Sequence, residues 1–465
     1  MDPLLRLYHL LPAPLRSGAA SVRGLYLRSW RYGRETERLV DEAIEREQWS
    51  EKQWETWKAE RQGFLLHRAA TAVPYYTEYW RRRQRQGGKA SWQYLENWPV
   101  LKKETVRAQP TAFVAEDRDI RSMFHEHTSG TTGTPLDLWW SRETVRAWYA
   151  LFEARVRRWN AVSRDHRWAL LGGQLVAPAR QVKPPFWVWN AGLRQLYMSS
   201  FHLAPDHVGT YLDALRRYQV TYMLGYASSM YALAQVVLEK GLEAPSLGIA
   251  ISNAEPLYPW QRQSIAEAFD CSVRDTYGMA EIVCAASECH AGSLHLWPEV
   301  GLLEVKGQVS EELVSEGRTG RLICTGLLNA DMPLIRYEVG DLGALAPRGK
   351  ACACNRSLPV LLQVEGRLDD VVLTPDGRRV GRLDPVFKAD MRIREAQIIQ
   401  ESLDRIRVKV VPTNGFGSAD VNDIIHRLES RLGSQMQILV EPVDRIPRTT
   451  AGKFQAVVSL LAKAG

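Results

Sequence analysis

The segment Thr128-Ser-Gly-Thr-Thr-Gly-Thr-Pro135 has the composition of an anion-binding loop. Its glycines let the backbone turn tightly and bring N–H groups close to a ligand, and its hydroxyls add further donors. No acidic residue interrupts the run, so the loop suits a nucleoside triphosphate. The residues that would bind phosphate are Thr128, Ser129, Gly130, Thr131, Thr132 and Gly133. An ordinary polar turn is the alternative interpretation.

The segment after this loop, Leu136-Asp-Leu-Trp-Trp140, is predicted to be a strand. The loop therefore turns between strands. It is not the Gly-x-x-x-x-Gly-Lys-Ser/Thr loop, which has other spacing and opens a helix.

A second candidate segment is Asp275-Thr-Tyr-Gly-Met-Ala-Glu281, which follows a strand-like run. A carboxylate such as Glu281 is a suitable ligand for Mg²⁺, a hard cation that prefers oxygen. The ring of Tyr277 can stack on a purine. Taken alone, a Tyr-Gly turn is common and carries little information.

Asp341 and Lys453, later in the chain, carry opposite charges. Asp341 ends a strand-like run, and its paired oxygens can accept both hydroxyls of a ribose. Lys453 lies on a Gly-containing loop near the C-terminus, from which an ammonium can reach a carboxylate or a phosphate. Without further context, Gly340-Asp341 is a turn and Lys453 is a solubilising residue.

Cysteines and histidines form a separate set. Cys289 and His295 precede Cys352 and Cys354 by about 57 positions, and three thiols with one imidazole suit tetrahedral zinc. The Cys-x-Cys spacing is tighter than in common zinc fingers, so reduced core cysteines are the alternative. Cys284 and His290 are possible substitutes in the ligand set.

The elements that must position these residues alternate between strands and helices from about 120 to 365. Apolar runs such as 167–173, 221–226 and 247–252 end in Gly, Tyr or Ser, and helical stretches separate them. This is the rhythm of a largely parallel sheet, in which ligands bind beyond the carboxyl ends of strands. The carboxyl ends of these predicted strands carry Tyr226, the segment 252–255 and the segment 277–281.

The two ends of the chain differ from this middle part. Residues 1–90 read as helical, with Arg, Trp and Tyr interleaved through 23–32. Such a stretch can lie on a membrane or bind nucleic acid, but a helical layer packed on the main domain, with its arginines facing solvent, is the preferred interpretation. Ser50 is predicted to cap a helix that ends before Pro74. From 369 onward, valine-rich strands and one amphipathic helix indicate a small α+β domain.

Bulk composition limits the alternatives. A chain of 465 residues divides into two or three domains, and a net charge of +7 favours anionic ligands only weakly. No apolar run reaches the roughly 18 residues of a membrane helix. Six cysteines in so long a chain do not form a disulfide scaffold, so we expect a cytoplasmic protein. No nucleic-acid partner is expected. The oligomeric state stays open, a homodimer included.

In the motif segments described above, the sequence resembles the AMP-forming adenylating superfamily. This superfamily includes acyl-CoA synthetases, peptide-synthetase adenylation domains and luciferases. The loop 128–135 resembles its phosphate loop, although that loop commonly carries Lys where this chain has Thr134. Arg336-Tyr-Glu-Val-Gly-Asp341 resembles the phenylacetate–CoA ligase branch. The N-terminal helices and Val73-Pro-Tyr-Tyr76 resemble its capsular-polysaccharide-associated subgroup.

The resemblance assigns further roles by position. It implies that Asn253, Ala254, Glu255 and Pro256 line the adenine, although the segment also reads as the start of a helix. Asp275, Thr276, Tyr277 and Gly278 would continue the nucleotide site, with the acid held by Tyr226, Gly278 and Met279. Arg367 would contact ribose or phosphate, and Asp369 would be the hinge. Lys453 would be the catalytic lysine, with Glu281 and Thr128 as the other catalytic residues.

The implied fold is α/β, with a helical N-terminal segment (1–90), a catalytic core of mostly parallel sheets (91–368) and a mobile α+β domain (369–465) that carries Lys453. The implied activity is ATP- and Mg²⁺-dependent formation of an acyl-adenylate from a carboxylic acid. The acyl group then passes to the thiol of CoA or, alternatively, to an amine. The resemblance also favours a structural zinc on Cys289, His295, Cys352 and Cys354.

A nucleotide-binding scaffold without catalysis is the competing hypothesis, because the loop lysine is missing. The presence of Glu281, Asp341, Arg367 and Lys453 argues against it. The acid is expected to be aryl or otherwise planar, with Trp187, Trp189 and Tyr197 as further aromatic candidates for its walls.

Overall fold

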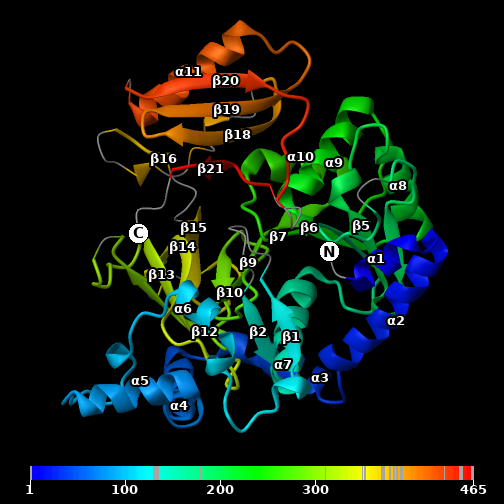
Figure 1. The fold of residues 1–465 in the computed structure, drawn as a ribbon. Coiled ribbons are helices and arrows are strands. Elements are labelled where there is room, and N and C mark those ends of the chain that lie inside the picture. The colour runs from blue at the N-terminus through cyan, green and yellow to red at the C-terminus, as the bar shows by residue number, and fades with distance from the viewer. Residues whose placement is uncertain are drawn as a thin grey trace.

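The fold is α/β with a separate C-terminal domain, as predicted, and is described here from a computed structural model (Figure 1). The described residues are 3–128, 136–178, 181–308, 310–347, 349, 352–367, 372–375, 379–380, 383, 386–387, 391–433, 435–449 and 454–461. In Figure 1 the C-terminal domain lies above two sheets of the large domain, and the N-terminal helices line the lower and right-hand sides.

The N-terminal segment is helical, as expected from its sequence. Ser50 forms the predicted cap of α4: its Oγ accepts from Gln53 N, and the Gln53 side chain accepts from Ser50 N. Val73 separates α4 from α5, which begins at Pro74, where a missing N–H costs nothing. The helices are α1 (Pro3–Leu10), α2 (Ala13–Arg31), α3 (Thr36–Glu45), α4 (Glu51–Ala72), α5 (Pro74–Arg85) and α6 (Lys103–Ala108).

A six-stranded sheet forms one half of the large domain. Its order is β4-β5-β3-β6-β7-β8, and all neighbours are parallel except the edge strand β4. The apolar residues of α8, α9 and α10 pack with its buried strands into one core. The strands are β3 (Trp168–Gly172), β4 (Trp187–Asn190), β5 (Gln195–Ser199), β6 (Tyr222–Tyr226), β7 (Ile249–Asn253) and β8 (Ser272–Arg274); the helices are α7 (Arg142–Phe152), α8 (Val208–Arg217), α9 (Ala227–Lys240) and α10 (Pro259–Phe269).

A seven-stranded sheet forms the other half, and all of its pairs are antiparallel. The prediction of mostly parallel sheets therefore holds only for the six-stranded sheet. The strands around β10 and β11 are joined by short turns, which cannot make the long crossover that parallel strands need. In the order β12-β13-β14-β15-β11-β10-β9, the strands are β12 (Gly301–Lys306), β13 (Gly320–Gly326), β14 (Tyr337–Leu345), β15 (Val360–Arg367), β11 (Leu294–Leu296), β10 (Ala285–Glu288) and β9 (Thr276–Gly278).

The C-terminal domain is a four-stranded sheet covered by one helix, as the valine-rich strands and amphipathic helix predicted. Ile406, Val408 and Val410 of β19 pack against Ile424 and Leu428 of α11 in its core. The strands are β18 (Ile393–Ser402), β19 (Arg405–Pro412), β20 (Gln437–Pro442) and β21 (Val457–Ser459), α11 is Ser418–Leu432, and a small hairpin precedes them as β16 (Val372–Leu373) and β17 (Arg379–Val380).

Among the described residues, no helix has both the length and the apolar character needed to cross a bilayer.

Candidate functional site

The hairpin of β1 (Phe124–His127) and β2 (Asp137–Trp140) carries the predicted phosphate loop between strands, as the sequence indicated. The base of the loop is closed by two hydrogen bonds. Thr128 N donates to Leu136 O, and Leu136 N donates to the buried Thr128 Oγ1, both at 3.0 Å. Thr128 thus holds the two ends of the loop together.

Several predicted site residues lie outside the described residues. They are the loop residues Ser129, Gly130, Thr131, Thr132 and Gly133, the hinge residue Asp369 and the catalytic candidate Lys453. The backbone of Arg367 is described, but its side chain is not.

The carboxyl ends of β6 and β7 bring two predicted segments together. Tyr226 and Asn253 are partners in the parallel register of these strands. Ala254 follows with φ 63°, a left-handed conformation that turns the chain away from the sheet. The Oδ1 atom of Asn253 is buried and has no hydrogen-bond partner among the described residues. An unpaired buried acceptor is costly, so this edge is suited to a ligand that donates a hydrogen bond.

Asp275 lies between β8 and β9, where the chain passes from the six-stranded to the seven-stranded sheet. Its N–H donates to Glu288 Oε2 at 2.7 Å, and its Oδ1 accepts from Thr276 N at 2.9 Å. Burial raises the pKa of Asp275 to about 7, and the adjacent charge of Glu288 also raises it. The hydrogen bond from Thr276 N acts in the opposite direction and lowers this pKa. Asp275 is thus a buried acid that ionises near neutral pH.

Tyr277 and Asp341 meet although they are 64 positions apart. The Tyr277 hydroxyl donates to Asp341 Oδ2 at 2.7 Å. Burial and the Asp341 charge hold the pKa of Tyr277 well above its usual value, so it remains a donor. The register of β14 and β15 also pairs Asp341 with Arg367. The structure thus brings three predicted nucleotide-binding residues to one place.

Glu281 is a buried carboxylate with a cation beside it. Its Oε1 accepts from Lys103 Nζ at 2.9 Å and from the Tyr337 hydroxyl at 2.8 Å. Burial opposes ionisation, but Lys103 and the hydrogen bonds outweigh it and lower the pKa of Glu281. No sequence motif pointed to Lys103, because its contact with Glu281 spans 178 positions.

The residue after Glu281 is held in a strained conformation. Ile282 has φ 46°, which β-branched residues rarely adopt. Packing with Trp30, Trp140 and Val145 buries its side chain. Strain of this kind persists where the surrounding structure imposes it and is common at functional sites.

Glu255 joins the two domains. Its Oε2 accepts from Ser228 N at the start of α9 (2.9 Å), and its Oε1 accepts from Phe454 N of the C-terminal domain (2.7 Å). Burial raises the pKa of Glu255, while these two N–H groups oppose the rise. Phe454 directly follows the catalytic candidate Lys453 in the chain, so Glu255 fixes the residue next to it. The contact spans 199 positions, and no signal in the sequence pointed to it.

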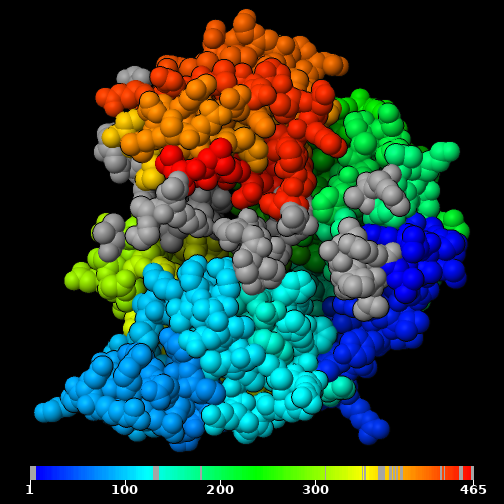
Figure 2. All heavy atoms as spheres, viewed as in Figure 1, coloured from blue at the N-terminus to red at the C-terminus, as the bar shows by residue number. Residues whose placement is uncertain are grey.

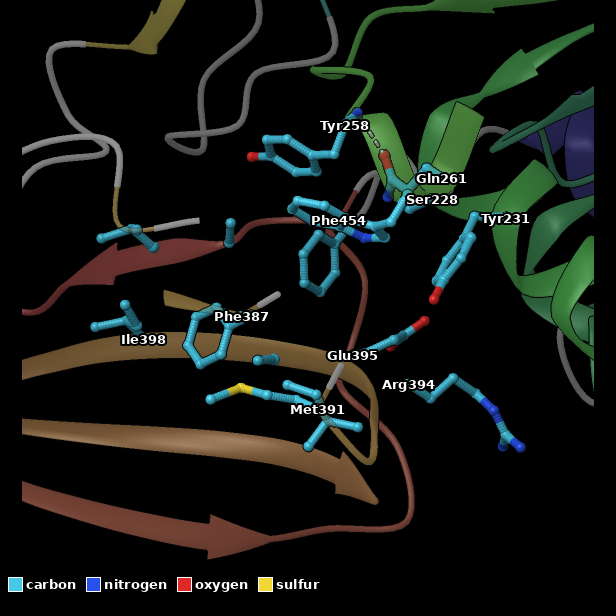
Figure 3. A pocket seen from close by; sticks show the side chains of 15 residues that line it. Ser228, Tyr231, Tyr258, Gln261, Phe387, Met391, Arg394, Glu395, Ile398 and Phe454 are labelled. Atoms are coloured by element: carbon cyan, nitrogen blue, oxygen red, sulfur yellow. Dashed lines mark hydrogen bonds between the residues drawn. The ribbon is translucent and has the colours of Figure 1, made fainter. Parts of the chain in front are cut away.

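A cavity of about 90 Å³ lies between α9, α10 and the C-terminal sheet (Figure 3). In Figure 3 the rings of Tyr258 and Phe454 lie on one side of it, and Phe387 and Met391 lie on the other. Arg394 of β18 pairs with Glu239 of α9 at 2.8 Å beside it. Because both domains contribute walls, the cavity exists only while they keep this arrangement.

The residues predicted to hold the acid are partly brought together. A Cβ atom at Gly278 would lie 3.9 Å from the Trp148 ring, so Trp148 forms a wall there. Tyr226 ends β6, and Met279 packs against the core that includes Tyr337. Trp187 and Trp189 lie on the edge strand β4, three strands from β6, where they pack against Tyr211 and Tyr218. Tyr197 is on β5, beside that edge.

The side chains of Cys289, His295, Cys352 and Cys354 converge, with their ligand atoms all within 4.8 Å of one another. Cys289 Sγ lies 3.6 Å from Cys352 Sγ, and Cys354 Sγ lies 3.2 Å from His295 Nε2. His295 Nδ1 lies 3.0 Å from Leu358 O, which leaves Nε2 facing the thiols. The substitutes Cys284 and His290 are not part of this cluster.

Comparison with known proteins agrees with this geometry. The AMP-binding enzyme family matches residues 76–328, more than half of the chain. The chain belongs to the AMP-binding enzyme family. It is therefore an ATP-dependent, AMP-forming ligase. A second family, the CapK C-terminal domain, matches residues 372–460.

Two relatives of this AMP-binding enzyme are informative. Protein CapK of Staphylococcus aureus is 25% identical over 401 residues, which are 83% of this chain and 84% of CapK. The phenylacetate-coenzyme A ligase of Thermus thermophilus is 28% identical over 262 residues, which are 49% of this chain and 58% of the ligase. The predicted superfamily, its phenylacetate–CoA ligase-like branch and the capsular subgroup are confirmed.

Among solved structures, 2-hydroxyisobutyryl-CoA ligase in the postadenylation state, with R3-HIB-AMP, matches with a TM-score of 0.68 at 22% identity. The match covers 89% of this chain and 91% of that one. The same ligase in the thioesterification state matches with a TM-score of 0.52. The fold of this AMP-binding enzyme therefore superimposes better on the first of these two structures.

The raised pKa of Asp275 makes a prediction about stability. Between about pH 4 and pH 7 the folded protein holds a proton that the unfolded chain has released. The free energy of unfolding therefore falls as pH rises, by up to about 1.4 kcal/mol per pH unit. Asp275→Asn removes the ionisable group and with it this fall in the free energy of unfolding. The stability of the variant relative to wild type should therefore increase as pH rises from 4 to 7. Urea unfolding from pH 4 to 8 measures the difference.

Asp206→Asn, at an exposed aspartate, is the matched control and should follow the wild-type pH dependence. A constant difference between Asp275→Asn and wild type from pH 4 to 8 would contradict the assigned pKa.

Proposed function

We propose that this enzyme activates a small carboxylic acid at the site formed by the ends of β7 and β9 and by Asp341 in the middle of β14. A carboxylate oxygen of the acid attacks the α-phosphorus of ATP, and the bond to pyrophosphate breaks. A nucleophile then attacks the acyl carbon, and AMP leaves. Three observations carry the proposal: Tyr277 bonds to Asp341, Thr276 bonds to Ser252 beside Asn253, and Ile282, the neighbour of Glu281, packs with Trp140 of the β1–β2 hairpin. Catalysis of this kind depends on positioning and charge stabilisation.

The nucleotide is assigned to four groups of residues. Asn253 Oδ1 would accept a hydrogen bond from the adenine, with Ala254 and Pro256 against the base and Tyr277 beside it. Asp341 would bind the ribose hydroxyls, with Arg367 as its strand partner. Asp275, Thr276 and Gly278 would complete the wall. The loop from Thr128 to Gly133 would bind the phosphates.

Glu281 is assigned the Mg²⁺. Both described hydrogen bonds of its side chain go to Oε1, so Oε2 remains for a cation. Mg²⁺ would neutralise phosphate charge there. Lys103 lies against the same carboxylate and supplies the second cation, which the phosphate loop lacks because Thr134 replaces lysine.

The catalytic ammonium is assigned to Lys453, which would hold the acid and the α-phosphate together. The hydrogen bond from Phe454 N to Glu255 supports this assignment, because it holds Phe454, the residue after Lys453, against the large domain. After adenylation, residues 369–465 would rotate about Asp369 relative to the core (91–368) and the N-terminal segment (1–90). Domain closure commonly uses a few such hinge positions.

CoA is the proposed acceptor, since relatives such as the Thermus ligase bear a CoA ligase name. An amine acceptor, giving an amide, is the second candidate. The similarity to Protein CapK and the match to the CapK C-terminal domain, neither of which bears a CoA ligase name, support it. For the acid, Trp148 beside Gly278, together with Tyr226 and Met279, supports an aryl or planar substrate.

Cys289, His295, Cys352 and Cys354 are assigned a structural zinc. In a tetrahedral site with Zn–S of about 2.3 Å, two sulfurs lie about 3.8 Å apart, close to the 3.6 Å between Cys289 and Cys352. The bond of His295 Nδ1 to a carbonyl fixes the tautomer that ligates through Nε2. Four protein ligands leave no open position, so this zinc would brace the fold. The free thiols also support a reducing, cytoplasmic location.

The test of the proposed function is ATP–pyrophosphate exchange with a panel of carboxylic acids, aryl acids included. The wild type should exchange label with at least one acid. Lys453→Ala should abolish exchange and leave ATP binding, measured by calorimetry, nearly intact. Mass spectrometry of products formed with CoA or with amines then separates thioester from amide. Equal exchange by Lys453→Ala and wild type would remove Lys453 from the mechanism.

Glu255 should act through the C-terminal domain. Glu255→Ala removes the acceptor of Phe454 N and should slow exchange by about tenfold or more, a barrier increase of about 1.4 kcal/mol. Transfer from a chemically prepared acyl-adenylate should fall much less, because that step uses another domain arrangement. Glu239→Ala, which removes the exposed pair with Arg394, is the control and should leave exchange nearly unchanged. Equal loss in both half-reactions would instead place Glu255 on the adenine.

Freshly purified enzyme should contain about one equivalent of zinc by mass spectrometry. The double variant Cys352→Ser, Cys354→Ser should lose the metal and unfold at a temperature lower by about 5 °C or more, because a folded-state ligand is lost. Cys271→Ser, outside the cluster, should keep both properties. Less than half an equivalent of zinc in the wild type would refute the site.

A further inference from the structure

The outer face of the N-terminal helices exposes an unusual amount of apolar surface. Of the fifteen large apolar side chains that are exposed among the described residues, six lie between positions 7 and 26, and Val182 lies next to Gln181, which binds Arg16. On α2, the exposed apolar residues recur at helical spacing and therefore share one face. Gly18, Ala19 and Ser29 lie on the same face. The six residues are Leu7, Leu10, Leu15, Val22, Leu25 and Tyr26.

This face is held outward by the packing of α2. A Cβ on Gly24 would lie 1.8 Å from Asn190 Oδ1, and a Cβ on Gly192 would lie 2.5 Å from Leu25 N. The two backbones therefore touch, and only glycine permits the approach. On the same inner side, the buried Arg16 donates to Val176 O and Gln181 Oε1. Leu15, Val22 and Leu25 cannot turn inward without breaking these contacts.

The same segment carries charge of one sign. Residues 3–34 contain six arginines and no Asp or Glu. Arg16 is buried, and Arg31 stacks on Tyr149. Arg23 and Arg34 are exposed, and neither forms an ion pair with a described residue. The expectation that the arginines face solvent holds for Arg23 and Arg34 but not for Arg16, and apolar side chains face solvent as well.

We propose that α1 and α2 dock this enzyme on the surface of a lipid bilayer that contains anionic headgroups. Helices with an apolar outer face and flanking arginines lie in the plane of the interface, with the apolar side chains among the acyl chains. Arg23 and Arg34 would bind lipid phosphates, and Tyr26 suits the boundary. In Figure 2, the dark-blue atoms of these helices form the right-hand margin of the molecule.

Two other occupants fit less well. A symmetric contact between two copies would place the same patch on itself and so bring two positively charged surfaces together. Like charges at such an interface oppose association. A nucleic acid would pair with the arginines but would leave the leucines in water. A bilayer satisfies both the charge and the apolar side chains.

Vesicle sedimentation tests the proposal with the full-length protein. Wild type should sediment with vesicles of three parts phosphatidylcholine to one part phosphatidylglycerol, and at least tenfold less with phosphatidylcholine alone. Leu15→Asp with Leu25→Asp should reduce binding to the anionic vesicles at least tenfold. Arg23→Glu with Arg34→Glu should reduce it at low salt, with little effect at high salt, where the charges are screened.

Leu403→Asp with Leu439→Asp is the matched control, because both residues are exposed on the C-terminal domain. It should bind vesicles as wild type does. Circular dichroism confirms that each variant is folded. The proposal is overturned if wild type ignores both vesicle types, or if the Leu15, Leu25 variant binds as well as wild type. It is also overturned if that variant instead dissolves a dimer seen by analytical ultracentrifugation.

Discussion

Carboxylates with little exposure at the junction of the two sheets set the geometry of the site. Glu281 is buried, and Glu255, Asp275 and Asp341 are half-buried, so each gains from donors within the protein. The donors come from distant parts of the chain: Phe454 N, Lys103 and the Tyr277 hydroxyl among them. Each such bond ties a segment of the chain to the place where strands β7 and β9 end, and together they assemble the site.

Lys103 pairs with Glu281 and holds it ionised despite burial. In the proposed function this carboxylate binds Mg²⁺, and the ammonium of Lys103 stands in for the lysine that the loop 128–135 lacks. The same logic applies at Glu255, where one carboxylate holds both the start of α9 and the residue after Lys453. A rotation of the C-terminal domain away from the large domain must break the bond from Phe454 N to Glu255.

Local chemistry in the sequence was enough to predict part of this structure. The cap at Ser50, the parallel sheet and the position of Tyr226 and Asn253 at neighbouring strand ends follow from short-range patterns. The Cys and His cluster was also predicted by residue type. The antiparallel pairing of the second sheet, the Lys103–Glu281 pair and the Glu255–Phe454 bond could not be predicted in this way. They join residues far apart in sequence, and the residues themselves look like ordinary connectors or caps.

The central claim is that one site, at the ends of β7 and β9 and at Asp341, binds the nucleotide. The most direct test is a crystal structure of the enzyme with AMP. Our account predicts ribose hydroxyls on Asp341, the base against Asn253 and Tyr277, and the phosphate toward Thr128. AMP bound instead in the cavity between α9, α10 and the C-terminal sheet, with no ribose hydroxyl on Asp341, would contradict it.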